Sequence, residues 1–247
     1  MLYFSSQLNI QEYKPAADRM FAALNLFNIK YKLLNNTNDI WARDFMPVKT
    51  KSGKYVSFRY EPSYLANNPQ LRTDFKTDIA PSFKVDNLVY TDINLDGGNV
   101  VFSPSKEKVI ISDRVFSENH GISEAELTAK LEKLLEASVL IIPSLKSDMT
   151  GHADGMVRFV DENTVVTNAP LSPYGFETKV KKSLQNYGFN VIDFPYFHSK
   201  GDSAVGCYLN YLATEKSIFL PVFGVDTDNE ALELAKNLFA KTIIPVN

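Results

Sequence analysis

One histidine and several charged residues crowd into the segment SDMTGHADGMVRF, residues 147–159. His152 and Asp154 are two residues apart, so on an extended strand their side chains would face the same way. An imidazole beside a carboxylate has a tuned pKa and can serve as a general acid or base. Such a pair is often only a structural hydrogen bond, but the glycines on both sides favour a functional site. Asp148 and Arg158 lie in the same segment and join the candidate set.

A second group of charged residues lies in NDIWARDFMP, residues 38–47. If this stretch is a strand, Asp39, Trp41 and Arg43 face one side and Asp44 faces the other. Asp44 could then point toward an interior. The same residues could instead form surface ion pairs around one core tryptophan, and the segment alone does not decide between the two interpretations.

The segments DINLDGGNVVF (92–102) and GCYLNYL (206–212) occupy matching places further along the chain. The paired glycines after Asp96 predict a bulge or a close backbone approach, although a plain Asp-Gly turn explains them equally well. In the other segment, Cys207 and Asn210 are the polar candidates. Cys207 is the only cysteine in the chain. Its apolar context predicts a buried, inert thiol, because a reactive thiolate needs electropositive surroundings.

These four segments together offer several carboxylates and one histidine. Carboxylates that face one pocket repel each other unless they meet a cation. A planar guanidinium, which can donate two hydrogen bonds to one carboxylate, fits that requirement. A carboxylate-bound metal ion would fit it too, and this alternative stays open. With three histidines and one cysteine, the chain has little material for a zinc site.

The segments recur at a regular interval, which indicates an internal repeat. Measured between Asp44, Asp96, His152 and Cys207, the intervals are 52, 56 and 55 residues. Each of these residues heads a predicted hairpin, and short strands of branched and aromatic residues follow helical segments. The predicted hairpins span 44–60, 97–112, 155–168 and 207–222, and the strands span 31–36, 87–94, 138–144, 190–196 and 241–247.

Helical segments precede the five predicted strands. Two of them open with a capping box, in one case Ser123 with Glu126 and in the other Thr227 with Glu230. The predicted helices span 11–27, 69–84, 123–137, 172–187 and 227–240, of which 69–84 has the weakest pattern.

A fifth hairpin would begin near residue 261 at the observed interval. The N-terminal segment MLYFSS is predicted to be its second strand and to close a ring, since an open sheet edge exposes unpaired backbone groups. We therefore predict a single domain over residues 1–247, with its fifth module incomplete at the C-terminus.

Composition narrows the classes of partner and location. The net charge of −3 gives no electrostatic basis for binding nucleic acid or an anionic membrane. No apolar run approaches the roughly 18 residues of a membrane-spanning helix. The N-terminus lacks the pattern of a signal peptide, and a single cysteine rules out an internal disulfide. We expect a cytoplasmic protein.

Taken in order, these motifs resemble the agmatine deiminase and bacterial peptidylarginine deiminase family of the pentein superfamily. The resemblance covers essentially the whole chain and is carried by WARD, LDGGN, GHAD followed by RF, and YLNYL followed by FLPVFG. It implies an α/β fold, a five-bladed pseudo-symmetric α/β propeller of ββαβ modules with its active site on the axis. It also implies a hydrolase that deiminates agmatine, arginine or peptidylarginine to a ureido product and ammonia, without a metal or organic cofactor.

The resemblance further implies roles for individual residues. Asp44 and Asp154 would hold the substrate guanidinium, and His152 would be the general acid/base. The remaining candidates would line or support the substrate channel: Trp41, Arg43, Asp96, Asp148, Arg158 and Asn210.

The nucleophile of this family is a cysteine in a glycine-rich segment of the fifth hairpin, near the C-terminus. Cys207 aligns with a small residue of the family instead, so residues beyond Asn247 are expected to supply the nucleophile. Met46 stands where relatives usually have glycine. If the chain truly ended at Asn247 it would be inactive, and the alternative would be a pentein that binds a guanidino ligand or a protein partner. The oligomeric state stays open.

Overall fold

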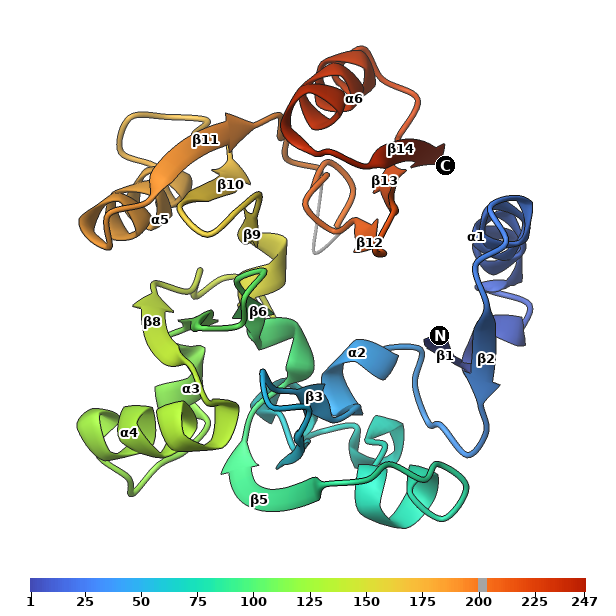
Figure 1. Ribbon diagram of the computed structural model, residues 1–247, viewed down its shortest axis with the longest axis vertical. Helices are drawn as coiled ribbons and strands as arrows, with labels where there is room; N and C mark the ends of the chain where they lie inside the picture. Colours follow the sequence, from blue (N-terminus) through green and yellow to red (C-terminus); the bar gives the residue numbers. More distant parts are fainter. Residues whose placement is uncertain (200–203) are drawn as a thin grey trace.

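The computed structural model describes residues 1–199 and 204–247, and within them five small sheets follow one another around a ring (Figure 1). In four sheets, the middle strand pairs antiparallel with the preceding strand and parallel with the strand that follows a helical segment. This order is the predicted ββαβ module. The strands of these modules are β3 (Val48–Lys49), β4 (Tyr55–Arg59), β5 (Leu88–Asn94), β6 (Val101–Phe102), β7 (Lys108–Ser112), β8 (Ser138–Ile142), β9 (Val157–Phe159), β10 (Thr164–Asn168), β11 (Asn190–Phe194), β12 (Leu212–Ala213), β13 (Ser217–Pro221) and β14 (Thr242–Val246).

The fifth sheet has two strands. β1 (Leu2–Ser5) pairs in parallel with β2 (Tyr31–Leu34), and α1 (Lys14–Leu26) connects them. β1 thus holds the place of a middle strand, and among the described residues it has no antiparallel neighbour. Phe21 of α1 shares an apolar cluster with Phe219 of β13 and Ile244 of β14, so the first and last modules pack against each other.

The longer helices lie at the periphery of the ring, while the short strands β3, β6, β9 and β12 lie nearer its centre (Figure 1). These helices are α1, α4 (Glu124–Leu135), α5 (Phe176–Asn186) and α6 (Thr227–Leu238). The apolar core lies between each sheet and its helix; Leu127 and Leu131 of α4, for example, are fully buried with Ile111 of β7. No helix in the described part of the chain is long and apolar enough to cross a membrane.

The predicted cap of α4 is confirmed. The hydroxyl of Ser123 accepts the backbone N–H of Glu126, which satisfies one of the free donors at the start of the helix. Leu127, Leu131 and Leu135 recur at four-residue spacing and form its fully buried stripe. The five predicted strands and the helices within 11–27, 123–137, 172–187 and 227–240 are likewise observed.

Two predicted helical features are wrong. Residues 69–84 contain no α-helix but a 3-10 turn, η3 (Pro69–Leu71), and a π-helical turn, η4 (Phe75–Ile79). Here the Asp74 carboxylate accepts the N–H of Thr77, and the Asp78 carboxylate accepts the N–H of Asp74. Such local side-chain bonds compete with the regular helical bonding pattern.

The predicted capping box of α6 is the second error. The residue that precedes the helix is Asp226, and its side chain makes no capping bond. Asp228 acts instead, because its carboxylate accepts the N–H groups of Phe223, Gly224 and Val225. A carboxylate with three donors forms stronger hydrogen bonds than a single hydroxyl, and so decides how the chain enters the helix.

The segments that precede the hairpins are short helical turns. They are α2 (Ala42–Phe45), η5 (Gly97–Asn99) and η6 (Ala153–Gly155). The extended geometry expected for residues 39–44 and 152–154 is therefore wrong. η5 contacts both α2 and η6, so three turns from three modules meet.

Candidate active site

Asp44, Asp96 and His152 meet where these three turns come together. Nε2 of His152 lies 2.7 Å from Oδ2 of Asp96, and Nδ1 lies 3.7 Å from Oδ1 of Asp44. The imidazole therefore stands between two carboxylates from different modules. The side chains of His152, Asp44 and Asp96 are only 11%, 9% and 10% exposed.

The glycines of LDGGN allow this close approach. A Cβ atom at Gly97 would overlap the carbonyl oxygen of Arg43. At Gly98, a Cβ atom would lie 2.5 Å from Nδ1 of His152 and 2.7 Å from Oδ1 of Asp44. The backbone N–H of Gly98 donates to that same Asp44 oxygen at 2.8 Å. The predicted close backbone approach is confirmed, and a plain Asp-Gly turn does not account for it.

Burial and crowding shift the protonation of both central groups. Burial raises the pKa of Asp44 to about 7; the charges of Asp96 and Asp154 add to the rise, and His152 opposes it. Burial alone would lower the pKa of His152, but its hydrogen bond to Asp96 and the neighbouring carboxylates raise it to about 9. At neutral pH the imidazole is therefore charged, and Asp44 titrates.

Asn99 locks the turns to one another. Its side-chain oxygen accepts the backbone N–H of Ser112, at the end of β7, and that of Ala153 in η6. Asn99 is 2% exposed, so this oxygen meets two donors in a dry environment. The bond fixes the chain next to His152 to the chain next to Asp96.

Arg43 and Arg158 each bind backbone of the following module. Arg43 donates to the carbonyl of Val100 at 2.7 Å. Arg158 donates to the carbonyl of Leu209 at 2.9 Å, and its guanidinium lies 4.9 Å from the ring centroid of Tyr211. Both arginines therefore tie modules together.

Arg43 also shares its surroundings with other charges. By surface area the residue is exposed, yet protein atoms surround its guanidinium. This crowding lowers the pKa of Arg43, against the raising effect of Asp154 and Asp44. Arg43 therefore interacts with two of the carboxylates around His152. Because its position is crowded but accessible, we interpret Arg43 as a residue that lines the centre of the ring.

The other sequence candidates lie further from His152. Trp41 is 57% exposed at the start of α2. Asn210 is exposed, and its Oδ1 atom would lie 3.7 Å from a Cβ atom at Gly155, next to Asp154. Asp148 is exposed, and its Oδ1 atom accepts the N–H groups of Thr150 and Gly151 in its own loop.

A residue that the motifs did not reveal completes the cluster. The hydroxyl of Tyr64, in η2 (Ser63–Leu65), donates to Oδ2 of Asp96 at 2.9 Å. Tyr60 is also buried close by, and burial together with the Asp44 charge raises its pKa. Neither tyrosine belongs to a recognisable motif, and the Tyr64 contact spans 32 residues.

A model of the Porphyromonas-type peptidyl-arginine deiminase family matches residues 7–247. The chain belongs to this family. The predicted family resemblance is therefore confirmed. No curated protein matches the chain.

Solved structures share the fold of this deiminase family member at low sequence identity. Agmatine deiminase from C. jejuni has a TM-score of 0.76 at 19% identity and covers 100% of this chain and 87% of its own. Agmatine deiminase of Enterococcus faecalis has a TM-score of 0.69 at 19% identity, over 88% and 72% of the two chains. DDAH from Pseudomonas aeruginosa has a TM-score of 0.61 at 12% identity, over 95% and 82%. These likenesses confirm the predicted pseudo-symmetric α/β propeller.

In this peptidyl-arginine deiminase family member, Cys207 has the environment predicted for an inert thiol. The residue is 9% exposed, and its sulfur donates to the carbonyl of Gly155 at 3.2 Å. Burial raises the pKa of the thiol to about 11, although nearby backbone N–H groups and Arg158 oppose the rise. The thiolate form that acts as a nucleophile is therefore disfavoured at neutral pH.

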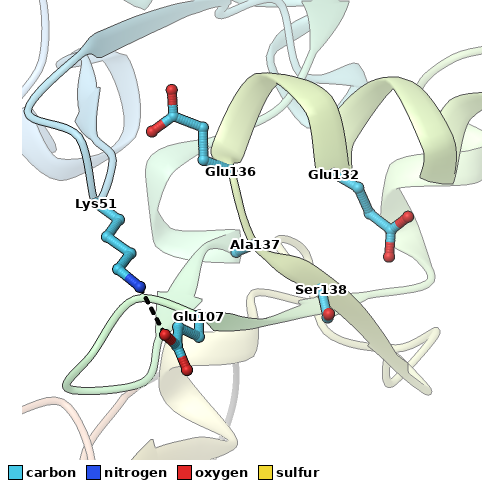
Figure 2. Close-up of a pocket in the computed structure, with 6 residues that line it drawn as sticks. All are labelled: Lys51, Glu107, Glu132, Glu136, Ala137 and Ser138. Atoms are coloured by element: carbon cyan, nitrogen blue, oxygen red, sulfur yellow. Dashed lines mark hydrogen bonds and ion pairs between the residues drawn. The ribbon is translucent and has the colours of Figure 1, made fainter.

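A hollow of about 360 Å³ lies between two hairpin turns and the end of α4, and His152 is not among the residues that line it (Figure 2). Its lysine is already paired: Lys51 lies 2.6 Å from Glu107, and next to the hollow Lys54 lies 2.9 Å from Glu136. Glu132 also lines the hollow, and its carboxylate accepts the backbone N–H of Val139. The cavity that borders His152 measures only about 10 Å³. In the described residues, no group of three or more His, Cys, Asp or Glu side chains is placed to hold a metal ion. The His152 cluster is therefore the candidate active site because of its chemistry and not because of the volume of its cavity.

Proposed function

We propose that the His152 cluster binds a guanidino group and supplies the acid/base chemistry of a hydrolase that deiminates it to a ureido product and ammonia. One observation carries the proposal: His152 stands between the buried carboxylates of Asp96 and Asp44, with Nε2 2.7 Å from Oδ2 of Asp96 and Nδ1 3.7 Å from Oδ1 of Asp44. Family membership supports it. So do two related solved structures, an agmatine deiminase cysteine-to-serine variant with substrate bound and a DDAH variant complexed with citrulline.

Binding would use Asp44 and Asp154 as guanidinium acceptors. Oδ1 of Asp44 already accepts the Gly98 N–H, which orients the carboxylate, and its second oxygen can accept from a planar ligand. A guanidinium satisfies two carboxylates at once because its N–H groups point outward in one plane. Its charge would lower the pKa of Asp44, so binding near pH 7 would release a proton.

Proton transfer would use His152. The Asp96 bond on Nε2 fixes the ring with Nδ1 toward Asp44, the side where the guanidinium would lie. With its pKa raised to about 9, the imidazole enters the reaction protonated and can give that proton to departing ammonia. The neutral imidazole left behind can then take a proton from the attacking water.

The nucleophile would come from the fifth module. In the other four modules, the segment that bears the site residue directly precedes the antiparallel strand of the hairpin. The corresponding position in the fifth module precedes a strand that would pair with the free edge of β1. We propose a cysteine there, in a segment that follows Asn247. Its thiolate would add to the guanidinium carbon, ammonia would leave, and water would hydrolyse the thiouronium to the ureido product.

Calorimetry with agmatine, arginine and an arginyl peptide tests the binding half of the proposal. We expect at least one of them to bind to the chain of 247 residues and to lose affinity in Asp44→Asn. An assay for ureido product with the natural gene product tests the chemical half, and its intact mass is expected to exceed 27.8 kDa. The absence of guanidino binding would rule the proposal out.

A second function is favoured by one observation, the burial of the Cys207 thiol, which is 9% exposed and donates to the carbonyl of Gly155. A pentein without a reactive thiol could bind a guanidino ligand and leave it unchanged. Binding without any ureido product in the natural gene product would decide for this alternative.

A further inference from the structure

Tyr64 and His152 both contact the same carboxylate oxygen of Asp96. Oδ2 of Asp96 accepts the Tyr64 hydroxyl at 2.9 Å and faces Nε2 of His152 at 2.7 Å. The Tyr64 ring also lies edge-on against the imidazole, with centroids 6.3 Å apart. Tyr64 therefore contacts both members of the acid/base pair, Asp96 and His152.

Charge-assisted hydrogen bonds hold the chain at Tyr64 in place. The Glu118 carboxylate accepts the backbone N–H of Ser63 at 3.0 Å and its hydroxyl at 2.6 Å. Arg114 donates to Glu118 at 3.0 Å and to the Ser63 hydroxyl at 3.0 Å, and its guanidinium lies 5.9 Å from the Tyr64 ring centroid. We call Ser63, Arg114 and Glu118 the clamp. Because Arg114 and Glu118 are 21% and 11% exposed, these bonds are partly shielded from water.

The clamp adjoins the acid/base pair. A cavity of about 10 Å³, close to the space that one water molecule requires, lies between them; its lining includes Asp96, Arg114, Glu118 and His152. The clamp therefore sets the position of Tyr64 without touching the place where a guanidinium would bind, on the Asp44 side of the imidazole.

Because Tyr64 and His152 share this Asp96 oxygen, the Tyr64 hydrogen bond contributes more when His152 is neutral than when it is charged. While His152 is charged, Asp96 has a cation beside it as well as the tyrosine hydroxyl. Once His152 loses its proton, the hydroxyl is the stronger of the two remaining donors to a negative carboxylate in a buried site. A hydrogen bond to an uncompensated buried charge is worth more than one to a compensated charge. Tyr64 therefore stabilises the deprotonated state more.

We propose that Tyr64 is a positioning residue that, acting through Asp96 and held by the clamp, makes it easier for His152 to release its proton. Its meaning for catalysis rests on the function proposed above, since release of this proton is the step that would discharge ammonia. The effect on the imidazole itself does not depend on turnover.

Several other groups act on His152 and must stay constant in any comparison. They are Asp44 from α2, Asp96 before η5 and Asp154 in η6, whose charges raise the pKa of His152, and Arg114 and Glu118, which line the same cavity. Tyr64→Phe leaves all of these charges in place, but it also removes the hydrogen-bond partner of the Tyr60 hydroxyl. Tyr60→Phe is therefore measured beside it, because a shift of the His152 pKa that Tyr60→Phe does not reproduce reports on the Tyr64 hydroxyl.

The test is an NMR titration of the imidazole rings in the chain of 247 residues. The chain has three histidines, and the single variants His120→Asn and His198→Asn assign the signal of His152. We expect Tyr64→Phe to raise the pKa of His152 by about half a unit, a roughly threefold higher proton affinity. Ser63→Ala, which removes a hydroxyl of the clamp and no charge, is expected to raise it by less. An unchanged or lowered pKa in Tyr64→Phe would overturn the proposal.

Tyr208→Phe is the matched control. It removes an equivalent tyrosine–aspartate bond, from the Tyr208 hydroxyl to Asp228 at 2.7 Å, and should leave the titration of His152 unchanged. If Tyr64→Phe does not fold, the Ser63→Ala shift decides, and its absence overturns the proposal.

Guanidino binding, measured by calorimetry on the same samples, keeps this inference separate from the proposed function. A raised pKa in Tyr64→Phe without any guanidino binding in the wild type would refute the function and uphold the effect of Tyr64. Guanidino binding in the wild type without a raised His152 pKa in Tyr64→Phe would uphold the function and refute the effect of Tyr64.

Discussion

The centre of the ring and the hollow of Figure 2 both contain carboxylates and cations, but the pKa values of their carboxylates shift in opposite directions. Asp44 at the centre is buried, and its pKa rises to about 7. Glu136 beside the hollow is less buried, with a side chain 31% exposed, and hydrogen bonds from Lys54 and Ser52 lower its pKa to about 2. The two carboxylates thus differ in burial and in their donors: Asp44 accepts one backbone N–H, from Gly98, whereas Glu136 accepts hydrogen bonds from Lys54 and Ser52.

This difference shows why the larger space is not the better candidate site. The hollow measures about 360 Å³ and the cavity beside His152 about 10 Å³. A ligand in the hollow would have to displace ion pairs that are already satisfied. Asp44 at the centre is buried and its pKa is raised, and strongly shifted groups of this kind cluster at functional sites.

The largest expected effect comes from removing the charge of Asp44. Asp44→Asn should weaken guanidino binding by a factor of about 100 or more, because a charge-assisted hydrogen bond and its Coulomb attraction are worth about 3 kcal/mol. Isothermal titration calorimetry at pH 8 measures this loss. Glu136→Gln, the same chemical change at the hollow, should bind as the wild type does. Equal affinities for Asp44→Asn and wild type would contradict the comparison.

Adding one methyl group at Gly98 is expected to have the second largest effect, on stability and on guanidino affinity. The Cβ atom of Gly98→Ala would meet His152 and Asp44 at 2.5 and 2.7 Å, so we expect a loss of about 1–3 kcal/mol in unfolding free energy from overpacking. Urea denaturation measures it, and guanidino affinity should fall as well. In Gly155→Ala the nearest atom is 3.7 Å away, so this control should stay within about 0.5 kcal/mol. Similar losses for both would mean that the close approach is unimportant.

The pH dependence of binding should follow Asp44. Its folded-state pKa of about 7 means that the carboxylate is neutral below pH 7 and charged above it. Guanidino affinity should therefore fall as the pH drops below about 7, by up to about tenfold per pH unit. Calorimetry between pH 5 and 8 tests this, and Asp44→Asn should remove the dependence on pH. A flat profile in the wild type would show that Asp44 does not titrate in this range.

The smallest effect is expected at the hollow. The folded-state pKa of Glu136 is lowered, so its contribution to stability is present above about pH 4.5 and is lost as the pH falls toward 2. Because the side chains of Lys54 and Glu136 are 23% and 31% exposed, water partly screens the pair, and Glu136→Gln should cost no more than about 1 kcal/mol at pH 7. Thermal unfolding at pH 7 and pH 3 measures it. A larger loss at pH 3 than at pH 7 would reverse the sign expected here.

The sequence by itself determined the repeated modules and the motifs of the site. Strand and helix patterns depend on neighbouring residues, so β8, β11 and the Ser123 cap of α4 were predictable where they occur. The interval between Asp44, Asp96 and His152 also placed these residues at equivalent points of successive modules. The inert character of Cys207 followed from its apolar neighbours.

Only the tertiary structure decided which side chains meet. The segments containing Asp44 and His152 were expected to be extended, but they turn helically at the centre of the ring, where three modules crowd together. Asp148 shares a motif with His152 yet turns to its own loop. Tyr64 belongs to no motif yet bonds to Asp96. Local pattern fixes the conformation of an element, whereas contacts between residues more than 30 positions apart depend on how the ring brings the modules together.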